Sequence, residues 1–155
     1  MRRMYSLEQL KEVVKNTKGY DIANLVDANG NERFIEGDVN IEETTGMSKV
    51  YGKWSLSGTH LMFVLVLNIA NATAYTSKTI ANIPLPAWVL DKLEPLFGTT
   101  IIPYTTFKAF KNDGTTNQNI DMRLVKITGG VAIGSYSFTA SDDRSVRVEF
   151  DLIVD

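Results

Sequence analysis

Few side chains in this sequence have the chemistry and spacing of a catalytic centre. His60 is the single histidine of the 155-residue chain, and cysteine is absent. The side chains that a nucleophilic triad or a thiolate centre requires are therefore almost absent. Zinc sites combine several His, Cys or carboxylate ligands. We therefore interpret His60, which follows a turn signal, as a turn or surface residue.

Two adjacent carboxylates are the remaining candidates for acid–base chemistry. Asp142 and Asp143 precede the last apolar segment, and glycosidases use a pair of carboxylates. Neighbouring residues in a turn point apart, however, and Ser141 with these aspartates is a typical turn sequence. We therefore favour a turn over a catalytic pair.

A partial calcium-loop pattern occurs nearer the N-terminus, at Asp27, Asn29 and Asn31. Glu32 stands where the loop requires glycine, and the twelfth position is Asp38 rather than the bidentate Glu. Asn29-Gly30 is also a strong hairpin signal, which we prefer. The sequence has no glycine-rich phosphate loop, G-x-S-x-G or H-E-x-x-H motif either. We therefore expect a non-enzymatic chain without metal or cofactor.

Composition narrows the class of protein further. Hydrophobic residues make up 44% of the chain, enough for the core of one domain. The formal net charge is −2 with both signs scattered, which argues against a nucleic-acid binder with a basic surface. The apolar run Leu61–Tyr75 is too short and too polar at its end to span a membrane. Glu8 and Glu12 make residues 1–14 a poor signal peptide, so we expect no secretion and no membrane insertion.

The first 49 residues are expected to form an appendage. Ser6 is a helix cap, the stripe Leu7, Leu10 and Val14 predicts about three helical turns, and Gly19 ends them. A helix this short is marginal alone, so the stripe needs a partner. The Asn29-Gly30 hairpin follows, and we interpret the acidic stretch 36–45 as a linker. Residues 1–49 would thus serve anchoring or trimerisation.

Residues 50–155 are predicted to form a mainly β, antiparallel sandwich or jelly-roll-like domain. Seven or so short strands are separated by turn signals, a spacing typical of sandwiches. The signals are Ser57-Gly58, Asn112-Asp113-Gly114 and Gly129-Gly130. In the first strand we place Val50 with Trp54 on the buried side, and Tyr51 on the other.

Two strands differ in how many faces are apolar. In the last strand Val146, Val148, Phe150, Leu152 and Val154 alternate with charged residues, which predicts one buried and one solvated face. The segment Leu61–Leu67 is apolar on both faces. Its second face, made of Met62, Val64 and Val66, must be covered by another element or another subunit.

One short helix is expected inside the β domain, between Pro86 and Pro95. Trp88, Val89, Leu90 and Leu93 supply its apolar side, and we expect Pro95 to force Glu94 out of helical geometry. The helix could cap one end of the sandwich, cover the second face of the strand 61–67, or join a subunit interface. The interface candidates of the whole chain are Leu7, Leu10, Val14, Met62, Val64, Val66 and Trp88.

Aromatic residues could line a carbohydrate groove. Tyr75 and Tyr104 lie near turns and are the better exposed candidates. The others are more often sandwich core; they are Phe107, Phe110, Tyr136 and Phe138.

Three segments together resemble a known family: "YGKWSLSGTHLMFVLVLNIAN", "TIANIPLPAWVLDKL" and the terminal "VRVEFDLIVD". They are similar to the C-terminal β-sandwich heads of short fibres on tailed phages, over about the last two-thirds of the chain. The resemblance implies a homotrimeric virion protein, a head fibre or short tail fibre, assembled in the cytoplasm of the host bacterium. It also implies attachment to capsid or tail proteins through the N-terminal segment, and exposed loops for host or surface-glycan contact. The family has no shared catalytic motif, so no active-site residue is carried over.

Two other functions remain open. One is a monomeric carbohydrate-binding β-sandwich module, which needs a groove with exposed aromatic side chains. The other is a glycan hydrolase using Asp142 or Asp143.

Overall fold

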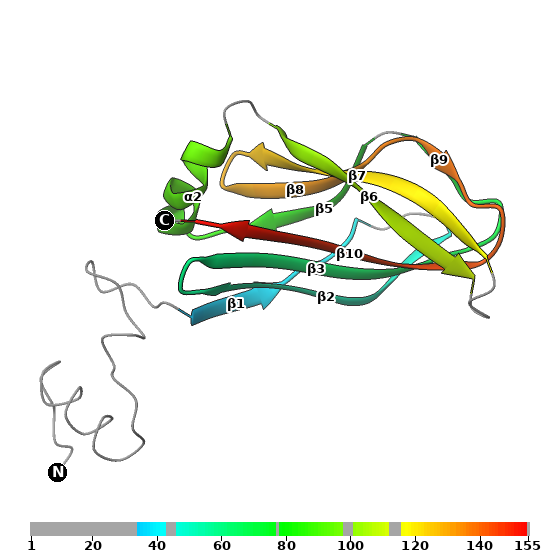
Figure 1. Cartoon of the computed structure of the whole chain (residues 1–155), viewed down its shortest axis with the longest axis horizontal. Helices are drawn as coiled ribbons and strands as arrows, with labels where there is room; N and C mark the ends of the chain where they lie inside the picture. The colour runs from blue at the N-terminus through cyan, green and yellow to red at the C-terminus, as the bar shows by residue number, and fades with distance from the viewer. Residues whose placement is uncertain (1–33, 43–45, 77, 98–100, 112–115, 155) are drawn as a thin grey trace, which may run out of the picture.

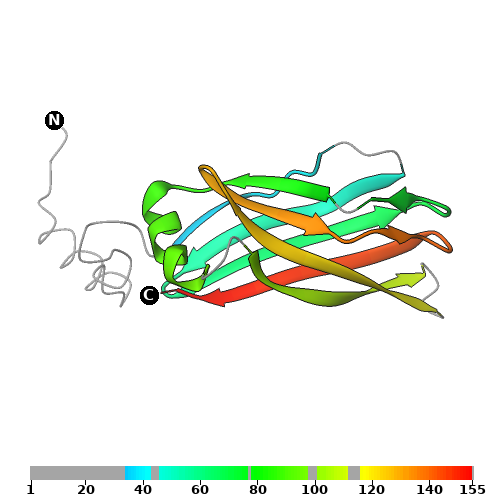
Figure 2. The ribbon, with the colours of Figure 1, turned by 90° about the horizontal axis from the view of Figure 1, so that it is seen from above.

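The computed structural model describes residues 34–42, 46–76, 78–97, 101–111 and 116–154. Four antiparallel strands form one layer of the fold, and four form the other (Figures 1 and 2). The first layer holds β1 (Phe34–Asp38), β2 (Met47–Ser57), β3 (His60–Ile69) and β10 (Arg144–Ile153). The second layer holds β6 (Ile101–Lys111), β7 (Asn117–Ile127), β8 (Gly130–Ser135) and β5 (Lys78–Pro84).

The layers belong to one sheet, with strand order β1-β2-β3-β10-β6-β7-β8-β5. β10 pairs with β3 from Arg144 to Ile153, but with β6 only from Arg144 to Val146. At the other edge Ile41 bridges Ala81. A small second sheet pairs β4 (Ala74–Tyr75) with β9 (Phe138–Thr139). The result is a nearly closed, barrel-like sandwich, so the predicted mainly β fold is confirmed.

The core lies between the layers and follows the period of two along each strand. Its largest fully buried side chains include Phe63 of β3, Met122 of β7 and Ile83 of β5. On β10, Val146, Val148 and Phe150 are buried while the charged residues between them are not. The predicted alternation of this last strand is confirmed.

Two of the predicted turns are confirmed. Ser57 pairs with His60 across a two-residue turn in which Gly58 has φ +62°. Ile127 pairs with Gly130 across a similar turn, in which Gly129 has φ +77°. Glycine adopts this left-handed region without the steric cost that Cβ imposes. The turn predicted at 112–114 and the hairpin at 29–30 lie outside the described residues.

The interpretation of the stretch 36–45 as a linker is wrong for its described part. Phe34–Asp38 is strand β1, paired with β2, and Val39 is fully buried in the core. Glu36 and Asp38 made the stretch look like a linker, but they are the solvated half of an edge strand. The β domain therefore extends upstream of Val50, at least to Phe34.

The position predicted for Val50 is also wrong. The register of β2 against β3 shifts between Lys49 and Tyr51, and Val50 is 59% exposed. A bulge adds one residue to a strand and shifts the sides on which residues point. Downstream of it, Trp54 is buried as expected.

The helix between the two prolines is α2 (Ala87–Leu93), and it caps one end of the sandwich (Figures 1 and 2). Val89 and Leu93 join the core, and Trp88 packs partly buried against it. Because α2 lies at the end, it does not cover the outward face of β3. The prediction that Pro95 forces Glu94 out of helical geometry is wrong. Glu94 keeps helical dihedrals, since Pro95 sits in the first turn of a following 3-10 helix, η2 (Glu94–Leu96). Proline fits that position because it needs no N–H donor there.

We predict that Gly52→Ala destabilises the domain severely. A Cβ at this buried position would overlap the carbonyl oxygen of Val39, whose N–H donates to Gly52 O. Because the overlapped atom belongs to the backbone, we expect a cost at the upper end of the overpacking range, about 3 kcal/mol or more. In the matched control Gly58→Ala, a Cβ would meet open space and cost only the positive φ, about 1–2 kcal/mol. Urea unfolding of both variants measures the difference, and equal midpoints would contradict the prediction.

Candidate functional site

The most distinctive surface lies on the outward side of the layer β1-β2-β3-β10. Leu61, Phe63, Leu65 and Leu67 of β3 are completely buried inward, so the residues between them point outward. We call Met62, Val64 and Val66 the apolar column. The outward side chains of the four strands together are the outer face.

Strand register places a charged or polar residue on each side of every member of the column. Val64 lies between Lys53 of β2 and Glu149 of β10. Met62 is flanked in the same way by Ser55 and Asp151, and Val66 by Tyr51 and Arg147. Val64 is only 7% exposed, which indicates that its neighbours partly shield the column from solvent.

Further apolar side chains gather on the same face. Among the described residues, six large hydrophobic side chains are exposed, and four of them lie here. Phe34 and Ile153 lie at one end of the face, in the row of His60. Val50 and Tyr51 lie toward the other end and border a shallow groove of about 470 Å³ along the column. A wide face with an apolar centre is characteristic of an interaction surface.

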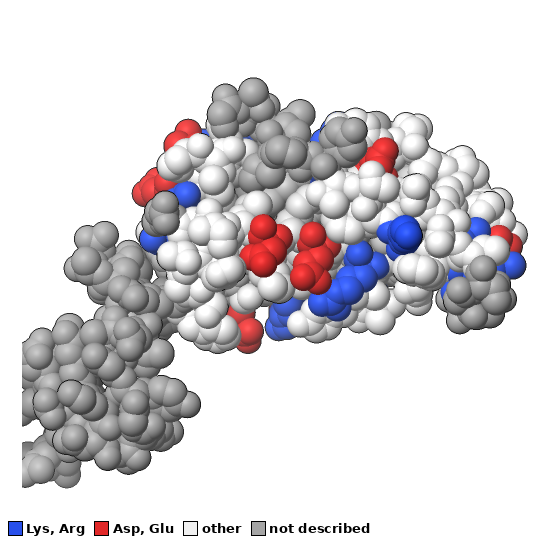
Figure 3. Space-filling view, in the orientation of Figure 1, with Lys and Arg blue, Asp and Glu red and all other residues white. Residues whose placement is uncertain are grey.

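The charges of the outer face form local pairs. Lys53 Nζ lies 2.8 Å from Asp38 Oδ1, and Arg147 Nε donates to Glu149 Oε2 at 3.0 Å. The hydrogen bond and charge of Lys53 lower the pKa of Asp38 below 3.8. The stabilisation from this exposed pair is therefore present above about pH 4 and lost as the pH falls further. In Figure 3 acidic and basic side chains lie next to one another over this side.

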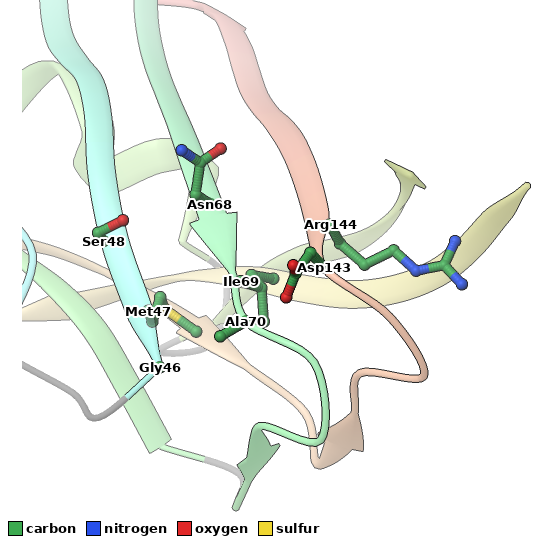
Figure 4. A pocket seen from close by; sticks show the side chains of 8 residues that line it. All are labelled: Gly46, Met47, Ser48, Asn68, Ile69, Ala70, Asp143 and Arg144. Carbon is green, nitrogen blue, oxygen red and sulfur yellow. The ribbon is translucent and has the colours of Figure 1, made fainter. Parts of the chain in front are cut away.

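A second concave site lies near the start of β2, where Asp143 meets the end of β3. It measures about 370 Å³ and offers Ser48, Asn68 and Asp143 as polar groups beside Met47. Figure 4 shows the carboxylate of Asp143 directed toward the site and the side chain of Arg144 directed away from it. Asp143 Oδ1 already accepts the N–H of Asn71 at 2.7 Å.

Arg144 itself is buried and connects the turn before β10 to Thr116, the residue before β7. Its guanidinium donates to Ser141 Oγ at 2.7 Å, Asp142 Oδ2 at 3.1 Å and Thr116 O at 3.1 Å. Its Nε is buried with no partner among the described residues. Asp142 and Asp143 thus contact different groups, as the predicted turn implies. The sequence offered no signal for this burial, since Arg144 looks like one more charged turn residue.

The other candidate residues have varied positions. His60 is exposed at the start of β3, with Nδ1 3.4 Å from Asp151 Oδ1. Tyr75, expected to be exposed, is only 3% exposed; its hydroxyl donates to Thr79 O at 2.7 Å, and its ring stacks on Phe138. That prediction was wrong because β4 and β9 pair over the ring, a long-range contact.

Phe110 is exposed, and Phe107 packs edge-on against Phe150. Leu7, Leu10, Val14 and the side chain of Tyr104 lie outside the described residues.

Comparison with family models, curated proteins and solved structures finds no match to this chain. Within the described residues no cluster of three or more His, Cys, Asp or Glu side chains could hold a metal ion. No helix in the same part of the chain is long and apolar enough to cross a membrane.

We predict that Arg144→Met lowers the free energy of unfolding by about 2–4 kcal/mol, because it strips the buried donors from Asp142, Ser141 and Thr116. Arg147→Met on the same strand is the control. Its side chain is 61% exposed and its guanidinium bonds only Glu149 among the described residues, so its loss should cost less than about 1 kcal/mol. Urea unfolding separates the two, and an equal loss in both variants would show that Arg144 is not a structural tie.

Proposed function

We propose that this chain is a non-enzymatic structural protein of a phage virion, a head fibre or short tail fibre that works as a homotrimer. The observation that carries the proposal is the outer face. A central strand presents Met62, Val64 and Val66 outward, with Phe34 and Tyr51 exposed around them. The three sequence segments similar to the heads of phage fibres support the virion setting.

The physical argument for assembly is the cost of leaving such a face in water. Exposed apolar surface gains about 25 cal/mol per Å² when it is buried. Copies of one chain bury such surfaces in closed symmetric oligomers. The local ion pairs Lys53–Asp38 and Arg147–Glu149 flank the column and would fix the register between copies. Three copies would also multiply weak contacts to a host surface by avidity.

The geometry of the titratable groups supports a non-enzymatic role. Asp142 pairs with Arg144, and Asp143 accepts the N–H of Asn71. A catalytic pair would direct both carboxylates at one reacting group. In the proposed virion, the 33 residues before β1 attach the domain to capsid or tail proteins. The protein would assemble in the cytoplasm of the host bacterium.

A monomeric carbohydrate-binding β-sandwich is the second candidate function. The site beside Met47 favours it, since Ser48, Asn68 and Asp143 present hydroxyl, amide and carboxylate groups around about 370 Å³. Groups of these kinds hydrogen-bond sugar hydroxyls. Glycan-array binding by a chain that light scattering finds monomeric would favour this module over the fibre.

We predict that the full-length chain is a trimer by light scattering on a sizing column, and that Met62→Lys with Val66→Lys weakens it. Two charges placed in an apolar contact should raise the dissociation constant by at least about 100-fold. Both side chains are partly exposed, so circular dichroism should report an unchanged fold. Asn119→Lys, on the exposed side of β7, is the matched control. If the unmodified chain is a monomer, the proposal is wrong. If the double variant forms the trimer as tightly as the unmodified chain, the outer face is not the interface between copies.

A further inference from the structure

The outer face is not covered by any helix or strand in the described part of the chain (Figure 1). Its apolar column is flanked by carboxylates that outnumber bases. Glu36, Asp38, Glu149 and Asp151 face outward against Lys53 and Arg147 alone, a formal net charge of −2. An occupant of this face should therefore carry an apolar stripe and an excess of positive charge.

One segment of the chain has both properties. Residues 1–20 hold five Lys or Arg and two Glu, a formal charge of +3 in a chain whose total is −2. The same segment contains the predicted helix with the stripe Leu7, Leu10 and Val14. On a helical wheel Lys11 and Lys18 lie within about 70° of the centre of the stripe, and Glu12 lies on the opposite side.

We propose that residues 6–18 cover the apolar column of the outer face within their own chain. The dimensions agree: the stripe from Leu7 to Val14 is about 10 Å long at 1.5 Å per helical residue. The column from Met62 to Val66 is about 13 Å long at 3.3 Å per strand residue. The lysine flank of the helix would lie along the carboxylates of β10, Glu149 and Asp151.

The connection favours the chain's own segment over that of another copy. Residues 19–33 lead to Phe34, which itself lies on the outer face, in the row of Ser57 and His60. From Phe34 to Val64 is about two strand spacings across and four residues along, or about 16 Å. Fifteen residues can reach about 50 Å when extended, so the connector is long enough to reach this position. A connector that can span two sites keeps them at a high effective concentration, in the millimolar range for short linkers, above that of separate chains in dilute solution.

The inference concerns the single chain and does not rest on the virion function. Under the proposed function, the N-terminal segment leaves the outer face when the trimer forms. We therefore expect the covered single chain at the low micromolar concentration of the test below, and the trimer at the higher concentration of light scattering. The same apolar surface would then be sheltered in the free chain and used in the assembly.

Disulfide trapping tests the contact directly, because the chain has no cysteine of its own. The full-length double variant Leu10→Cys with Met62→Cys is oxidised at low micromolar concentration and analysed by non-reducing electrophoresis and peptide mass spectrometry. We expect an intramolecular disulfide in most chains. The control pairs Leu10→Cys with Asn119→Cys, whose second position lies on the other layer and is exposed. Equal trapping in both pairs would overturn the proposal, as would purely intermolecular disulfides, which would assign the face to a second copy.

Thiol labelling provides a second readout that does not require a bond to form. The thiol in full-length Met62→Cys should react about tenfold faster when Leu10→Asp and Val14→Asp are added, because charging the stripe releases the cover. The labelling rate of Asn119→Cys should not change with the same additions. An unchanged rate at position 62 would overturn the proposal, whereas the fibre proposal would still be judged by the oligomeric state alone.

Discussion

The inward row of β3 is the interaction on which the rest of the fold depends. Leu61, Phe63, Leu65 and Leu67 are all fully buried, and each such side chain contributes about 1.5–3 kcal/mol on burial. β3 is also the strand against which both β2 and β10 are registered along most of their length. A shift of the pairing register by one residue would expose the whole row to solvent. The row therefore fixes the register of three strands at once.

The same constraint determines the outward side. Once the odd-numbered residues of β3 point inward, Met62, Val64 and Val66 must point outward, between the residues that β2 and β10 place beside them. Those neighbours are charged or polar, and they reduce the exposure of Val64 to 7%. The side chains beside Val64 in the register, Lys53 and Glu149, can shield the centre of the apolar column with their aliphatic parts. What remains for a partner is the groove and the exposed apolar side chains at its ends.

Period and turn chemistry explain which features could be predicted from sequence. The alternation of β10, the two apolar faces of β3 and the glycine turns at Gly58 and Gly129 depend on neighbouring residues, and the structure confirms them. The errors at Glu36 and Tyr75 involve pairing between distant segments, whereas those at Val50 and Glu94 arise from a local bulge and a 3-10 turn. Glu36 resembled a linker residue because the residue it pairs with, Ser55, lies 19 residues downstream. Tyr75 looked exposed because Phe138, which pairs with it, lies far along the chain. The burial of Arg144 likewise depends on Thr116 and Ser141, which no local pattern connects.

The contrast between the two concave sites bears on function. The site beside Met47 has polar groups, but Asp143 is already engaged by Asn71. On the outer face, two of the four carboxylates, Asp38 and Glu149, are each bonded to a neighbouring base. Recognition there would come from apolar area and from the order of the charge pairs, not from one reactive group. Under the proposed function, such a surface would select partners by shape and register, as repeated contacts between identical chains require.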